Sequence, residues 1–124
     1  MYANVEAVLV AYLTGQCGLL GVSVDMPNTP PLPFALVTRT GGSDDYITDA
    51  ATIDIDVFNT TRSTAYDTAA QVHALMRRLR HTAVGTTVID HAETIMGPTW
   101  VSYDDEHLQR YVMRMRIDSR VTAA

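Results

Sequence analysis

Lysine is absent from this sequence, and cysteine occurs once, as Cys17. A single thiol excludes an internal disulfide and every metal site built from paired cysteines. All nine basic residues are arginine. Arginine favours bidentate pairing with carboxylates, although a bias toward GC-rich codons explains the same composition. Because Cys17 follows the first predicted helix rather than preceding a helix, we expect an inert, at least half-buried thiol.

Long hydrophobic runs are also missing. The apolar stretch "MYANVEAVLVAYLTG" has no basic region before it and no small-residue cleavage pattern, which argues against a signal peptide. It is too short and too interrupted to span a bilayer, so we expect a soluble protein with no membrane partner.

Positive charge is scarce in the first half of the chain. Residues 1–58 contain seven acids and one base, a balance of −6, whereas residues 59–124 contain seven acids and eight arginines, a balance of +1. The net charge of −5 does not fit a basic, nucleic-acid-seeking domain. With 124 residues, 47% of them hydrophobic, the sequence predicts one domain over residues 1–124 with a substantial core.

Two segments have the periodicity of amphipathic helices. The first has Asn4 as its N-cap, Gly15 as its stop, and an apolar stripe at Val5, Val8, Leu9, Tyr12 and Leu13. The second begins with a capping-box-like pair, Thr64 and Asp67. Its stripe is Ala65, Ala69, Val72, Met76 and Leu79, and its end carries Arg77, Arg78 and Arg80, which complement the helix dipole.

The remaining patterns favour β-strands. We expect strands in "GVSVDM", "FALVTRT" and "ATIDIDVF", from Thr86 to about Met96, and in "QRYVMRMRIDSRV"; "PNTPPLP" is an extended loop and "GGSDDYITDA" a polar loop or hairpin extension. The order is α-β-β-β-α-β-β. It predicts an α+β fold, with a mainly antiparallel four- to five-stranded sheet and two helices packed on one face.

Alternating carboxylates mark the stretch "TIDIDVF". Asp54 and Asp56 share one strand face, and the intervening isoleucines share the other. Arg114 and Arg116 alternate in the same way on the last strand, so opposite charges are expected to pair across one wet face of the sheet. A catalytic or two-metal pair would need further ligands converging in a pocket, which alternation on an open face does not supply. We interpret the carboxylates as structural.

Other candidate sites fall short of a complete constellation. His91 and Glu93, beside Asp90, supply two metal ligands on one strand face, fewer than the usual three or four. His107 adjoins the acids of "DDE" in a hydrophilic turn, His73 flanks the apolar stripe of the second helix, and the acids of residues 44–49 lack the spacing of a calcium loop. We therefore expect no catalytic residue, no metal, no cofactor and no enzymatic activity.

Three segments carry a family resemblance when their order and spacing are taken together. They are "VEAVLVAYL", "IDIDVFNTTRSTAYDTAAQVHALMRRL" and "GPTWVSYDDEHLQRYVMRMRIDSRV". The chain resembles, across most of its length, the tail terminator (tail completion) proteins of phages with long non-contractile tails. It departs from that pattern in the unusually polar "SYDDEH" between Trp100 and the last strand.

The resemblance implies a structural protein of the virion, assembled in the host cytoplasm. Such a protein forms a homo-oligomeric ring, typically a hexamer, on the head-proximal end of the tail tube. It stops tube growth and presents a surface to the head–tail connector or stopper protein. Its partners would be itself, the tail tube protein and the connector, and DNA would pass through its lumen without sequence-specific binding. The family offers no catalytic residues to carry over.

A ring of identical subunits joins two different surface patches, which suits a chain of asymmetric charge. The candidate subunit-interface residues are Arg110, Arg114, Arg116 and Trp100. The candidate lumen-facing or neighbour-facing acids are Asp44, Asp45, Asp49, Asp54 and Asp56, which would repel DNA phosphates and let DNA slide. Alternatively, these acids solvate an outer surface.

Two other functions stay open. The nearer is a head-side connector or stopper, which also forms rings and which sequence alone separates poorly from a tail terminator. A small α+β enzyme or ligand-binding domain would use the "DHAE" strand and nearby acids.

Overall fold

The computed structural model describes residues 4–44 and 47–121, with side chains up to Arg120. The elements are α1 (Val5–Leu13), β1 (Gly21–Ser23), β2 (Phe34–Asp44), β3 (Asp49–Asn59), α2 (Arg62–Arg77), β4 (Thr82–Val84), β5 (Thr87–Trp100) and β6 (Gln109–Val121). The predicted α+β class and the placement of both helices are confirmed.

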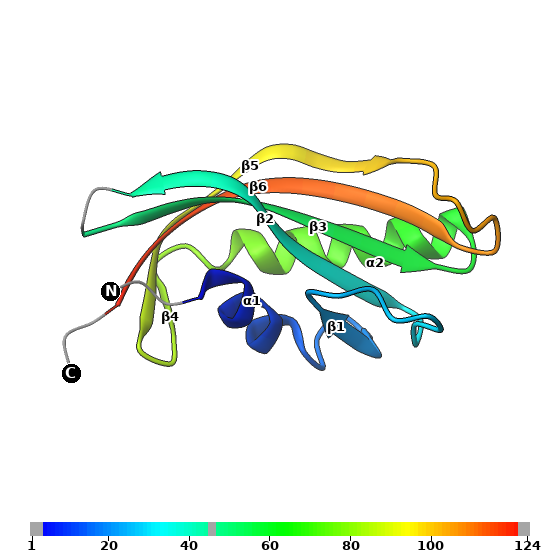
Figure 1. Cartoon of the computed structure of the whole chain (residues 1–124), viewed down its shortest axis with the longest axis horizontal. Helices are drawn as coiled ribbons and strands as arrows, with labels where there is room; N and C mark the ends of the chain where they lie inside the picture. The colour runs from blue at the N-terminus through cyan, green and yellow to red at the C-terminus, as the bar shows by residue number, and fades with distance from the viewer. Residues whose placement is uncertain (1–3, 45–46, 122–124) are drawn as a thin grey trace.

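The strands form one curled mixed sheet in the order β1-β2-β3-β6-β5-β4. Only the β1–β2 pair is parallel, and the other four pairs are antiparallel. The prediction of four to five strands was too low, because "HTAVG" contains the short strand β4. Figure 1 shows α1 and α2 on the same side of the long strands, and among the described residues no helix lies on the opposite side of the sheet.

The core lies between the helices and one face of the sheet. Odd-numbered residues of β3 and β6, such as Ile53, Ile55, Met113 and Met115, point toward the helices and are fully buried. The predicted apolar stripe of α2 is buried in full, as are Leu9 and Leu13 of α1. The Tyr12 hydroxyl donates a hydrogen bond of 3.0 Å to the Leu75 carbonyl, which ties the two helices together.

Side-chain caps fix the helix starts. The Asn4 side chain accepts a hydrogen bond from the Ala7 N–H at 3.3 Å, which confirms the predicted cap of α1. Gly15 follows with a φ of +77°, a left-handed conformation that favours glycine and ends the helix. The capping box of α2 consists of Thr61 and Thr64, not Thr64 and Asp67. The prediction was wrong by one turn, because Thr61 supplies the same hydroxyl three residues earlier.

Replacing Thr61 with alanine tests this cap. Its hydroxyl accepts a hydrogen bond from the Thr64 N–H at 3.1 Å, and alanine leaves that donor without its partner. We expect the free energy of unfolding to fall by about 1 kcal/mol in urea denaturation. Ser63→Ala, at an exposed position in the same turn, is the matched control. Equal effects of the two changes would contradict the assignment of Thr61 as the cap.

The described parts of the segment 41–50 extend the pairing of β2 with β3, as a hairpin extension would. Strand β2 continues to Asp44, and β3 begins at Asp49. Gly42 permits this close pairing, because a Cβ at that position would lie 2.1 Å from the Ala50 carbonyl oxygen. At the other end of the sheet, β5 runs to Trp100 rather than Met96, with three shifts of register against β6.

The helices of this fold are short. In the part of the chain that the structure describes, neither is long and apolar enough to cross a membrane.

Candidate functional site

A ladder of ion pairs crosses the face of the sheet that the helices leave open. Asp54 of β3 lies directly opposite Arg114 of β6, and its carboxylate accepts hydrogen bonds of 2.7 and 3.1 Å from that guanidinium. Arg116 pairs with Asp118 at 3.0 Å, and Arg120 of β6 pairs with Asp90 of β5 at 2.9 Å. The predicted cross-strand pairing is therefore confirmed for Asp54 and Arg114.

One end of the same face is covered, which corrects the prediction of a uniformly wet face. Phe58 shares the face with Asp54 and Asp56, yet it is only 1% exposed. The connection between β5 and β6, residues 101–108, places the Tyr103 ring against Phe58 with centroids 4.9 Å apart. Phe34 also packs on Phe58, with centroids 6.5 Å apart, and Val112 on the same face is buried as well. The polar segment "SYDDEH" thus belongs to a loop anchored by an aromatic cluster.

Asp56 lies at the boundary between the covered and open parts of this face. Its side chain is 17% exposed and lies 3.6 Å from the Arg110 guanidinium. Burial raises the pKa of the Asp56 carboxyl, the positive charge of Arg110 offsets part of this shift, and the neighbouring Asp54 adds to it. Arg110 also donates to the carbonyls of Val101 and Ser102, at 3.4 and 2.7 Å, so it holds the start of the loop.

The raised pKa of Asp56 predicts a specific pH dependence. The folded state holds this proton more tightly than the unfolded chain does. The stability contributed by Asp56 is therefore fully present below its unfolded pKa, about 3.9, and is lost as the pH rises through the higher folded value. At neutral pH, the free energy of unfolding of Asp56→Asn should equal or exceed that of the wild type. In acid, it should be lower than that of the wild type.

Asp54→Asn is the comparison for this prediction. It removes an exposed ion pair with Arg114, which should lower the free energy of unfolding at neutral pH by up to about 1 kcal/mol. Urea titrations of both variants at acidic and neutral pH make the test. A loss of stability by Asp56→Asn that grows from acid to neutral pH would refute our assignment of burial as the dominant effect.

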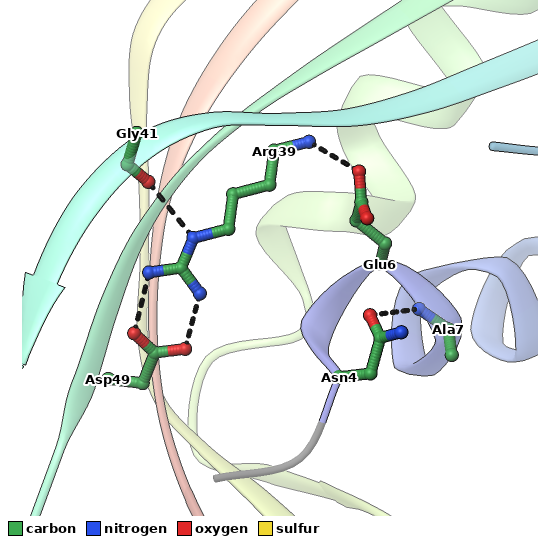
Figure 2. A network of polar contacts seen from close by, with 6 residues as sticks. All are labelled: Asn4, Glu6, Ala7, Arg39, Gly41 and Asp49. Carbon is green, nitrogen blue, oxygen red and sulfur yellow. Dashed lines mark hydrogen bonds and ion pairs between the residues drawn. The ribbon is translucent and has the colours of Figure 1, made fainter.

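A second network lies on the helix side of the sheet (Figure 2). Arg39 of β2 binds Asp49 of β3 through two hydrogen bonds, of 2.6 and 2.7 Å, and Asp49 is 3% exposed. The Arg39 side chain also donates to the Gly41 carbonyl at 3.2 Å, while its backbone N–H donates to the Glu6 carboxylate of α1 at 2.8 Å. This network joins α1 to the β2–β3 hairpin. Asp49 therefore lies on the opposite face from Asp54 and Asp56.

The candidate acids do not form one surface. Asp44 is exposed at the end of β2, Asp54 and Asp56 lie on the open face, and Asp49 is buried against Arg39. Asp45 lies outside the described residues. The roles proposed for these acids stay predictions.

The candidate interface residues all make contacts within the chain. Arg110, Arg114 and Arg116 form the ion pairs described above. Trp100 is 38% exposed; its ring lies 4.5 Å from the Arg62 guanidinium at the start of α2, and its indole N–H donates to the Gln109 side chain at 3.0 Å. Trp100 thus contacts the first residue of α2, and its role between subunits stays a prediction.

The histidine candidates are separated from one another. His91 and Glu93 share the open face, 3.2 Å apart. His107 donates its backbone N–H to Asp105, and His73 hydrogen-bonds Thr94 at 2.8 Å. Within residues 4–44 and 47–121, no group of three histidine, cysteine, aspartate or glutamate side chains is arranged to hold a metal ion. Burial raises the pKa of the Cys17 thiol.

Comparison with known proteins gives a likeness of fold. No protein-family model matches the chain, and no curated protein is significantly similar to it in sequence. A solved structure described as "Virion of native gene transfer agent (GTA) particle" contains a chain of similar fold, with a TM-score of 0.68 and 14% identity. The likeness covers 93% of this chain and 93% of that chain.

Proposed function

We propose that this protein is a structural component of a phage-like virion, and that it forms a ring on the head-proximal end of the tail tube. There it ends tube polymerisation and offers the surface for head joining. The main observation that supports this proposal is the likeness of fold, over 93% of both chains, to a chain of a gene transfer agent virion. The sequence resemblance to tail terminators supports the finer assignment.

The charge distribution is compatible with a ring. Identical subunits in a ring use two different patches for each contact, and this chain has a charged open face on one side and helices on the other. We keep the residues Arg110, Arg114, Arg116 and Trp100 as interface candidates. Because Arg114 already neutralises Asp54, the open face repels DNA less strongly than unpaired acids would. A lumen position for that face rests on the resemblance.

A structural role without catalysis is part of the proposal. The support is that four of the five arginine–aspartate ion pairs of the described residues join neighbouring strands, while the fifth, Arg116–Asp118, lies within β6. We expect purified protein to contain metal at far below one ion per chain, and stoichiometric metal would favour the enzyme alternative instead.

Deletion of the gene from its parent phage tests the proposal. Electron microscopy of the lysate should show overlong tubes unattached to heads, and complementation with the wild-type gene should restore normal tails. Tails of normal length beside filled heads would move the protein to the head side of the joint, as a connector or stopper. Intact infectious particles would overturn a structural role.

A further inference from the structure

The arginines that lack a partner are gathered at one place. Five of the nine form ion pairs with aspartates, and Arg62 stacks on Trp100. In the described part of the chain, the side chains of the other three make no ion pair or hydrogen bond, and all three are exposed: Arg77, Arg78 and Arg80. The helix dipole accounts for cations in the last turn of α2, but Arg80 lies beyond the helix end.

A cavity adjoins this arginine cluster. It has a volume of about 440 Å³, opens to solvent between α2 and β5, and is lined by His73, Arg77, Arg80, Ala92 and Thr94. Burial lowers the pKa of His73, and Arg77 adds to this effect, so the two guanidiniums carry the positive charge. Guanidinium groups match carboxylates in geometry and charge, so the cavity is suited to an acidic side chain.

Near the start of α2, the described residues include three acidic side chains that form no ion pair. Asp104, Asp105 and Glu106 are exposed in the loop 101–108 and form no ion pair within the described residues. One oxygen of Asp105 accepts the His107 N–H at 2.9 Å. Figure 1 shows this loop beside the start of α2, whereas the arginine cluster follows its end. The two groups therefore lie near opposite ends of α2 within one subunit.

The loop 101–108, called the acidic loop below, is anchored in a way that makes it a suitable partner for the arginine cluster. The packing of Tyr103 on Phe58 and the hydrogen bonds from Arg110 hold the segment before the three acids. Little ordering entropy is lost when a loop fixed in this way binds. DNA phosphate is a less favoured occupant, because the chain carries a net charge of −5.

We propose that the acidic loop of one copy docks against the arginine cluster of the next copy, with carboxylates entering the cavity between α2 and β5. The contact joins two different patches, so it generates a ring or an open chain of subunits. This inference rests on the ring proposed above and adds one pair of surfaces to its interface candidates.

Disulfide trapping tests the contact. Arg80→Cys and Asp105→Cys are combined in one chain that also carries Cys17→Ser, and the protein is oxidised both purified and during infection. We expect a covalent ladder extending beyond the dimer. The control pairs Arg80→Cys with Ala11→Cys, on the exposed side of α1, and should give no ladder. A ladder that stops at the dimer, or none in either setting, would overturn the proposal.

Charge exchange provides a second test. Arg77→Glu with Arg80→Glu should weaken self-association by at least about tenfold, and Asp104→Arg with Asp105→Arg should do the same, because like charges then meet. All four changes in one chain should restore association, measured by sedimentation and by yield of joined particles. Failure of this rescue, while gene deletion still lengthens tails, would refute the contact and leave the proposed function standing. Rescue without any effect of deletion on tail length would refute the function alone.

Discussion

Replacing Arg39 with alanine is expected to lower the free energy of unfolding by about 3 kcal/mol. The change removes both hydrogen bonds to Asp49, a residue that is 3% exposed, and leaves its buried carboxylate without a cation. Removing one partner of a buried ion pair costs more than the pair itself contributes, because the remaining charge has lost its hydration. Urea or thermal denaturation at neutral pH measures the effect.

Two variants define what the Arg39 result means. Arg114→Ala breaks the exposed pair with Asp54 and should cost far less than Arg39→Ala, which makes it the control for loss of an arginine. Arg39→Met combined with Asp49→Leu replaces the pair by apolar side chains and should recover much of the loss. Equal losses in Arg39→Ala and Arg114→Ala would contradict a buried pair that supports the hairpin.

The contact between Arg39 and Asp49 was not predicted from the sequence. Alternation along β3 places Asp54 and Asp56 on one face and, by the same rule, places Asp49 on the other with Ile53. The segment 41–50 was interpreted as a polar loop or hairpin extension, so the alternation was not carried back to Asp49. No sequence signal pairs Arg39 with Asp49, because their contact depends on the register shift between Arg39 and Gly41.

Elements with many periodic positions were predictable from sequence, and short ones were not. The apolar stripe of α2 and the apolar face of β6 each extend over many residues, and both are buried as predicted. Strand β4 has three residues and pairs only with Thr87–Ile89 across a turn at Gly85, too short for a periodic signal. Likewise, nothing in "GVS" shows that β1 runs parallel to β2, because its partner is chosen by tertiary packing.

The sequence predicted the ion pair of the candidate site, but not the aromatic packing that covers one end of the sheet face. Phe58 continues the face of Asp54 and Asp56, so an aromatic residue at the end of a polar face was the available signal that something packs there. The covering residue, Tyr103, is 45 positions away in a polar segment, and only the structure brings the two together. The unpartnered arginines were assigned to the helix dipole, which explains Arg77 but not Arg80.

Phe58→Ala is expected to lower the free energy of unfolding by about 3 to 4 kcal/mol, because it leaves a cavity in place of a buried ring that contacts both Phe34 and Tyr103. Leu20→Ala, at a side chain that is 70% exposed, should stay within about 0.5 kcal/mol and serves as the control. Phe58→Leu, which keeps most of the apolar volume, should fall between the two.

The same variant separates anchoring of the acidic loop from overall stability. Without the Phe58 ring, Tyr103 loses its packing partner, so amide hydrogen exchange in residues 101–108 should accelerate well below the unfolding temperature, while exchange in α2 stays slow. Since the loop then has to be ordered at the moment of docking, self-association of Phe58→Ala should weaken although every charge at the proposed contact is retained. Unchanged exchange in the loop would contradict the anchoring. Faster exchange with undiminished association would show that subunit contact does not depend on a fixed loop.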